Sequence, residues 1–151
     1  MTENTMNRLT WGIALAAIIL LIFANPGHAD GLTPDQQQAA EVAAGEAPAS
    51  LVGPDAFRGV VCTMVARLES PRFPDTLEGV LAAYYAKPRT LTAQEAEIAA
   101  AVFGGDVTCP ALYFALGGGD VARLGLRAGD VVMGRGQWTV HFYAESPWGA
   151  K

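Results

Sequence analysis

Apolar residues recur every three or four positions through much of residues 34–103, the spacing of helices with one buried face. The clearest example opens at Pro54 and Asp55, and its strongly apolar face predicts the central helix of the core. Residues 48–53 before it should form a loop, and two prolines exclude helix from residues 70–74 after it. The apolar face consists of Phe57, Val60, Val61, Met64, Val65 and Leu68.

Three further helices are marked by residues that cap helix starts. Thr33 with Gln36, and Thr92 with Glu95, have the spacing of capping boxes, in which each side chain bonds the other residue's backbone N–H. A shorter helix follows a cap at Asp75 or Thr76. These three helices should cover about residues 34–46, 77–84 and 93–103.

After residue 110 the pattern changes to short apolar runs typical of strands. Residues 111–116 read ALYFAL, while residues 130–133 and 138–143 flank a glycine-rich turn, as in a β-hairpin. Alternation along the last strand predicts one polar face, formed by Thr139, His141 and Tyr143. A helical core followed by a small antiparallel β-sheet predicts an α+β domain.

The N-terminus has the layout of a secretory signal peptide. Arg8 precedes residues 11–24, an uncharged apolar run, and small residues stand at the −3 and −1 positions before a cleavage point after Ala29. A membrane-spanning helix needs about 20 apolar residues, and this run is shorter. We expect residues 1–29 to be removed. If they are retained as an anchor, residues 11–24 would give a transient association with the membrane.

Either outcome places residues 30–151 outside the cytoplasmic membrane, in the periplasm, the cell wall or the medium. A chain of 151 residues is enough for one such domain. Its net charge of −5 gives no electrostatic footprint for nucleic acid. Cys62 and Cys109 either form a disulfide, as an exported pair can, or stay two buried thiols. With His141 they lack the spacing of a zinc site, so no metal or cofactor is expected.

Several short motifs follow one another in a distinctive order. Gly45-Glu46-Ala47 ends the first helix, Ala66-Arg67 lies near the end of the core helix, and SPRFPDTLEGV covers residues 70–80. Tyr113-Phe114 then lies in a strand, and His141-Phe142-Tyr143 ends the last one. Over residues 36–144 this order resembles the SleB-type cell wall hydrolases, known from spore cortex-lytic enzymes.

The resemblance implies a lysozyme-like fold that cuts the glycan strands of peptidoglycan, with Glu46 as the catalytic acid. It also suggests Tyr113, His141 and Tyr84 as residues that bind the sugar. Tyr113 could equally be packed in the core, and His141 could instead satisfy a buried backbone group. For Tyr84 the plain packing role is favoured.

The chemistry suits the position of Glu46. Cleaving a glycosidic bond requires a proton for a poor leaving-group oxygen. A helix C-terminus with small apolar neighbours would disfavour a charged carboxylate, as a general acid needs. A lytic transglycosylase route needs this one carboxylate, whereas a muramidase-like hydrolytic route wants a second. Asp55, Glu69 and Asp75 are the acids in this region, and no motif singles one out, so we favour the one-acid route.

The chain departs from the family pattern at two places. It reads GEAPAS where the family has GEARGE, and Ala66 stands where the family has Asn before the arginine. These losses leave a second interpretation open, a catalytically degenerate protein that binds peptidoglycan without cleaving it. Arg67 itself is expected to be a surface or snorkelling cation. The pattern leaves the end product and the biological role open, whether wall remodelling, germination or phage lysis.

Overall fold

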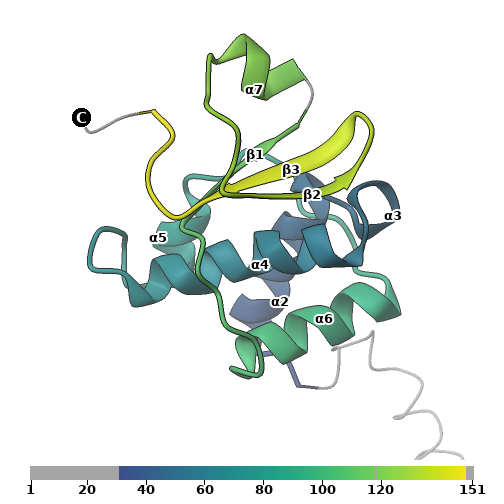
Figure 1. Cartoon of the computed structure of the whole chain (residues 1–151). Coiled ribbons are helices and arrows are strands. Elements are labelled where there is room, and N and C mark those ends of the chain that lie inside the picture. The colour runs from purple at the N-terminus through teal and green to yellow at the C-terminus, as the bar shows by residue number, and fades with distance from the viewer. Residues whose placement is uncertain (1–30, 118, 149–151) are drawn as a thin grey trace, which may run out of the picture.

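The computed structural model describes residues 31–117 and 119–148 (Figure 1). The predicted signal peptide and its alternative role as an anchor, residues 1–29, lie outside the described residues. Within the described part of the chain, no helix combines the length and apolar character needed to cross a membrane.

Helices come first along the chain and a small sheet follows, so the predicted α+β class is confirmed. The three strands are antiparallel in the order β1-β3-β2, and β2 and β3 form the predicted hairpin. The helices are α2 (Pro34–Glu46), α3 (Ala49–Val52), α4 (Pro54–Glu69), α5 (Leu77–Leu81), α6 (Ala93–Phe103) and α7 (Gly119–Arg123). The strands are β1 (Tyr113–Leu116), β2 (Val131–Arg135) and β3 (Trp138–Tyr143).

The long helices begin where the sequence predicts. Thr33 caps α2 and Thr92 caps α6, and both capping boxes are complete. The predicted loop at residues 48–53 is wrong, because residues 49–52 form the short helix α3. The helix α5 ends at Leu81, so Tyr84 lies in the connection after it. The helix α7 was not predicted; its first turn contains Asp120, which follows a run of glycines typical of a turn.

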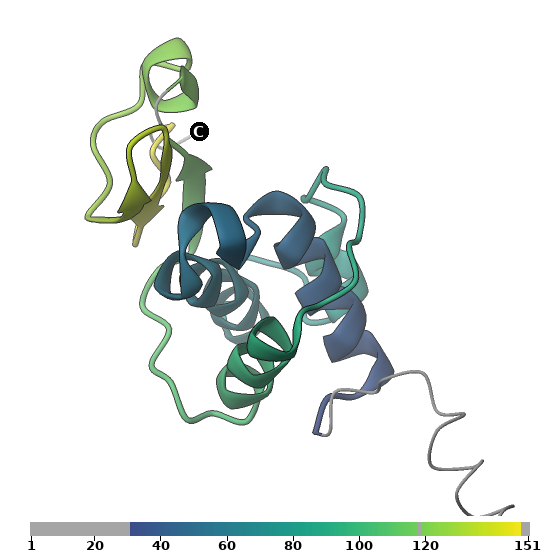
Figure 2. The ribbon, with the colours of Figure 1, turned by 90° about the vertical axis from the view of Figure 1, so that its right-hand side faces the viewer.

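The core surrounds α4, as its apolar face predicts. Figures 1 and 2 show the sheet on one side of α4, with α2 and α6 on the other. Gly59 of α4 lies against the ring of Phe142, and any Cβ at this position would overlap the ring. This close approach lets the sheet pack directly on the helix. The fully buried residues of α4 are Phe57, Val60, Val61, Thr63 and Met64.

Cys62 and Cys109 form a disulfide, which decides between the two states that the sequence left open. The bond joins α4 to the segment that leads from α6 into β1. A closed loop spanning 47 positions of sequence removes much conformational freedom from the unfolded chain. The disulfide therefore fixes the start of the sheet against the helical core.

The predicted polar face of β3 is only partly correct. Tyr143 is fully buried, and its hydroxyl donates a hydrogen bond to the carbonyl oxygen of Arg127 at 3.1 Å. The guanidinium of Arg127 also lies over the Tyr143 ring, with its central carbon 5.2 Å from the ring centroid. The chain before β2 thus covers this end of the sheet, a long-range contact that strand alternation cannot reveal.

Candidate active site

Glu46 is the last residue of α2, and its side chain is half-buried. Its Oε1 accepts hydrogen bonds from the backbone N–H groups of Tyr85 and Ala86, both at 2.9 Å. Its Oε2 has no hydrogen-bond partner among residues 31–117 and 119–148. The surroundings of Oε1 are therefore polar, unlike the apolar setting that the sequence suggested, and the carboxyl group is oriented with one oxygen open.

The two N–H donors belong to residues 85–89, which we call the 85–89 loop. This loop lies along the last turns of α2, where the N–H of Arg89 donates to the carbonyl oxygen of Glu41 at 3.0 Å. A Cβ on Gly45 would overlap the carbonyl oxygen of Lys87. Glycine before the acid is therefore what permits the loop to reach Glu46.

Arg67 is at the centre of an aromatic cluster. Its guanidinium carbon lies 5.0, 5.2 and 5.5 Å from the ring centroids of Phe73, Tyr84 and Tyr113, respectively. Its Nε donates to the carbonyl oxygen of Leu112 at 2.8 Å. The expectation of a surface or snorkelling cation is wrong, because the half-buried side chain places its guanidinium against three rings from separate segments, on which a planar guanidinium stacks well. We call Arg67, Phe73, Tyr84 and Tyr113 the Arg67 cluster.

Tyr84 connects this cluster electrostatically with Glu46. Its hydroxyl shares a 3.1 Å hydrogen bond with Oγ1 of Thr63. Burial raises the pKa of Tyr84, the charge of Arg67 and the bond to Thr63 act in the opposite direction, and the negative charge of Glu46 raises it further. The charges of Glu46 and Arg67 thus act in opposite directions on the pKa of Tyr84, whose ring packs against the core.

Tyr113 lies at the outer side of the Arg67 cluster. Its ring is 5.6 Å from that of Phe73 and meets that of Trp148 edge-on at 6.2 Å, both measured between centroids. Trp148 is 52% exposed, and Tyr85, whose N–H binds Glu46, is 95% exposed. Exposed rings of this kind can stack on a sugar. Trp148 was not predicted, because no motif distinguishes it in the sequence.

The structure places His141 on the central strand β3, where its Nδ1 accepts a hydrogen bond from the N–H of Gly129 at 3.2 Å. Val140 and Phe142 point into the core, so His141 points to the opposite face of the sheet. The structure does not bring His141 to Glu46 by any hydrogen bond between described residues. A part in sugar binding stays a prediction for His141, and its observed contact is with the backbone.

None of the acids considered as a second carboxylate is bonded to Glu46 among the described residues. Asp55 pairs with Arg58 at 2.7 Å on the exposed start of α4, and Glu69 and Asp75 are exposed. No cluster of three or more His, Cys, Asp or Glu side chains suited to a metal ion occurs among the described residues. Glu46 is the acid whose carboxyl group the structure orients at the end of α2.

Among the described residues, two cavities lie away from Glu46. One of about 570 Å³ is formed between α4, the segment after α6 and β2, and is largely apolar. One of about 370 Å³ lies beside α3 and the β2 end of the hairpin. Neither is lined by Glu46, Tyr84, Tyr113 or His141.

Comparison of the chain with models of protein families, with curated proteins and with solved structures finds no match. The functional argument therefore depends on the geometry of Glu46 and the residues around it. That geometry combines an oriented carboxyl group, an open oxygen and a neighbouring cluster of aromatic rings with a cation.

Proposed function

We propose that this protein is an exported enzyme with a lysozyme-like fold that cleaves the bond between N-acetylmuramic acid and N-acetylglucosamine in peptidoglycan. Glu46 serves as its single general acid and base. The observation that carries the proposal is the carboxyl group of Glu46, held through Oε1 by two backbone N–H groups with Oε2 open. A catalytic acid must be fixed in direction before it can transfer a proton efficiently.

The reaction begins when Glu46 donates its proton to the glycosidic oxygen. The bond from this oxygen to C1 of N-acetylmuramic acid breaks, both electrons go to the oxygen, and an oxocarbenium-like centre remains at C1. The Glu46 carboxylate then takes the proton of the 6-hydroxyl of the same sugar, whose oxygen bonds to C1 and gives an anhydro end. Attack by water at this stage would give a hydrolytic product instead. Asp55, Glu69 and Asp75 lie on exposed parts of the chain and no motif singles one out as a second catalytic acid, so we favour the anhydro route, which needs one carboxylate.

The aromatic side chains near Glu46 suit a glycan. Sugar rings present C–H faces that stack on aromatic rings, and the exposed rings of Tyr85 and Trp148 offer such faces, with the half-buried Tyr113 beside Trp148. Tyr84 directly precedes the donor Tyr85 and would contact the sugar through its hydroxyl, which is bonded to Thr63. His141 lies farther along the sheet, on the same face as Tyr113. It would contact the glycan only if the bound glycan strand extends over this face.

The decisive experiment compares wild type with Glu46→Gln on purified peptidoglycan. The amide keeps the shape and the acceptor oxygen for Tyr85 and Ala86 but carries no acidic proton, so release of soluble fragments should fall at least about 100-fold. Glu41→Gln on the same helix is the matched control and should release fragments at the wild-type rate. Mass spectrometry of the products tests the route, because anhydro ends identify the transglycosylase. Full release by Glu46→Gln would refute the proposal.

A peptidoglycan-binding protein without activity is the second candidate. It is favoured by the departures from the family pattern, GEAPAS in place of GEARGE and Ala66 before Arg67. In this case wild type and Glu46→Gln would sediment equally with the wall and neither would release fragments.

Fractionation of expressed protein would separate a cleaved exported form from one held in the membrane by residues 11–24.

A further inference from the structure

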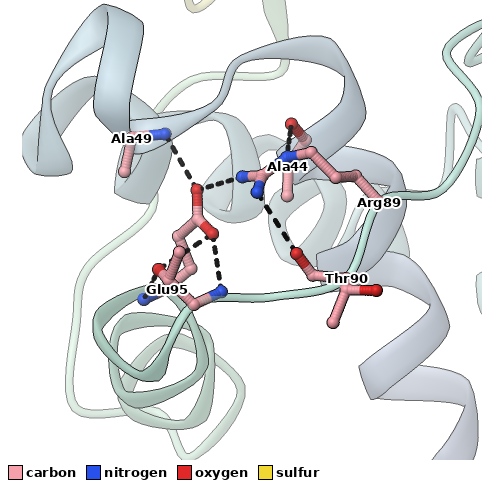
Figure 3. Close-up of polar contacts among 6 residues, drawn as sticks. Ala44, Ala49, Arg89, Thr90 and Glu95 are labelled. Carbon is pink, nitrogen blue, oxygen red and sulfur yellow. Dashed lines mark hydrogen bonds and ion pairs between the residues drawn. The ribbon is translucent and has the colours of Figure 1, made fainter.

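Glu95 is a buried acid that its capping role alone does not explain. It is 1% exposed, yet its carboxylate accepts four hydrogen bonds. Oε2 takes the N–H and the hydroxyl of Thr92, at 2.9 and 3.0 Å, as a capping box requires. Oε1 takes the N–H of Ala49 at 3.0 Å and a guanidinium N–H of Arg89 (Figure 3). Half of its bonds therefore go to the chain around Glu46.

Arg89 completes the connection from the other side. Figure 3 shows its guanidinium between Glu95 and the carbonyl oxygen of Ala44, which accepts a hydrogen bond from Nε at 3.2 Å. A second guanidinium nitrogen donates to the carbonyl oxygen of Thr90, also at 3.2 Å. Arg89 thus bonds the helix end, the start of α6 and its own loop at the same time, which the fork of an arginine permits.

The bonded positions bracket the acid. Ala44 lies two residues before Glu46 and Ala49 three residues after it, and the 85–89 loop ends at Arg89. The N–H groups that hold Oε1 belong to Tyr85 and Ala86 in this same loop. Movement of Arg89 away from α2 would therefore displace both donors.

We propose that Glu95 and Arg89 are positioning residues, which fix the 85–89 loop against the end of α2 and so set the direction of the Glu46 carboxyl group. The catalytic consequence rests on the proposed function of Glu46. The structural consequence, an ordered pair of N–H donors on Oε1, does not. A displacement of about 1 Å at a reacting group can lower a rate roughly 100-fold.

The amide protons of Tyr85 and Ala86 provide a direct spectroscopic test on the full chain. A hydrogen-bonded amide proton responds to the charge of its acceptor, so both resonances should shift as Glu46 titrates in wild type. In Glu95→Gln and in Arg89→Ala we expect this response to shrink or disappear at both amides. Glu97→Gln, an exposed acid two residues after Glu95 on α6, is the control and should keep the full response.

Kinetics on peptidoglycan form the second readout. Glu95→Gln and Arg89→Ala should lower kcat roughly 10- to 100-fold with KM nearly unchanged, because the glycan contacts remain while the acid is misdirected. Arg89→Lys, which keeps the charge but loses the bond from Nε to Ala44, should lie between wild type and Arg89→Ala. This conservative variant decides the question if Glu95→Gln fails to fold.

The outcomes separate the two proposals. A folded Glu95→Gln or Arg89→Lys with the wild-type response at Tyr85 and Ala86 overturns the positioning role. If wild type releases nothing from the wall, the proposed function fails, and the amide titration alone decides whether Glu95 and Arg89 order the loop. Loss of kcat together with the amide response supports both.

Discussion

The helical part of the molecule, residues 34–103, and the sheet part, residues 113–143, use ion pairs differently. In the helical part Glu95 is 1% exposed and joins Arg89 inside a network of backbone bonds. In the sheet part Asp120 and Arg123 pair with side chains 45% and 69% exposed. Water competes less for the first pair than for the second, because Glu95 is buried, although Arg89 is 38% exposed. The same chemical contact thus lies within a network of bonds beside Glu46 and joins two exposed side chains of α7.

Two features join these parts, and breaking the first should have the largest effect. Removal of the disulfide by Cys62→Ala with Cys109→Ser should lower the free energy of unfolding by about 4 kcal/mol, because the loop it closes is long. Denaturant unfolding with and without a reductant measures this difference. The double variant should not respond to the reductant, and an equal loss in the variant and in wild type would contradict the explanation.

The next variant tests the contrast between the two ion pairs. Glu95→Gln leaves the Arg89 charge without its partner inside the network, so we expect a loss of about 3 kcal/mol in the free energy of unfolding. Asp120→Asn in the exposed pair should leave the unfolding midpoint nearly unchanged. Equal losses for the two variants in denaturant unfolding would show that burial does not distinguish the pairs.

Arg67 is the second joint between the parts, and its effect should be smaller. Arg67→Ala removes three cation–ring contacts and the bond to Leu112, so we expect the free energy of unfolding to fall by about 2 kcal/mol. Arg67→Lys keeps the charge but not the planar fork and should lose part of this. Thermal unfolding followed by aromatic circular dichroism measures both variants. An Arg67→Ala variant as stable as wild type would contradict a stabilising role for the Arg67 cluster.

The smallest expected effect concerns pH. Burial alone would raise the pKa of Glu95, but the bonds from Thr92 and Ala49 and the charge of Arg89 together lower it. The unfolded chain then holds more protons than the folded one just below the ordinary pKa of a glutamate, about 4.3. The stability that Glu95 contributes is complete above that pH and is lost as the pH falls through the lowered pKa. The difference in stability between wild type and Glu95→Gln should therefore shrink below about pH 4, while a constant difference would contradict this.

The parts of the fold that depend on neighbouring residues could be predicted. Thr33 and Thr92 mark the starts of α2 and α6 through capping bonds that span three positions. The apolar face of α4 follows from the spacing of apolar residues within the helix itself. The short helix α3 could not, since four residues form a helix only with help, here the bond from Ala49 to Glu95. The burial of Tyr143 likewise depends on the chain around Arg127.

The candidate site follows the same division. Glu46 at a helix end was predictable, because the pattern of α2 stops there. Its two N–H donors come from residues 39 and 40 positions later, and the rings around Arg67 come from three segments. Glu95 was recognised as the end of a capping box, but its bonds to Ala49 and Arg89 exist only once α2, α3 and α6 have packed.

Gly45 gives the neighbouring acid an unusual genetic signature. Because even a methyl group there would collide with the carbonyl oxygen of Lys87, position 45 should tolerate replacement as poorly as position 46, although it has no reactive group of its own. A saturation library selected for function would then retain Gly45 and Glu46 together, with few substitutions at either position. A library selected for folding alone would accept replacement of Glu46 but would still reject larger residues at position 45.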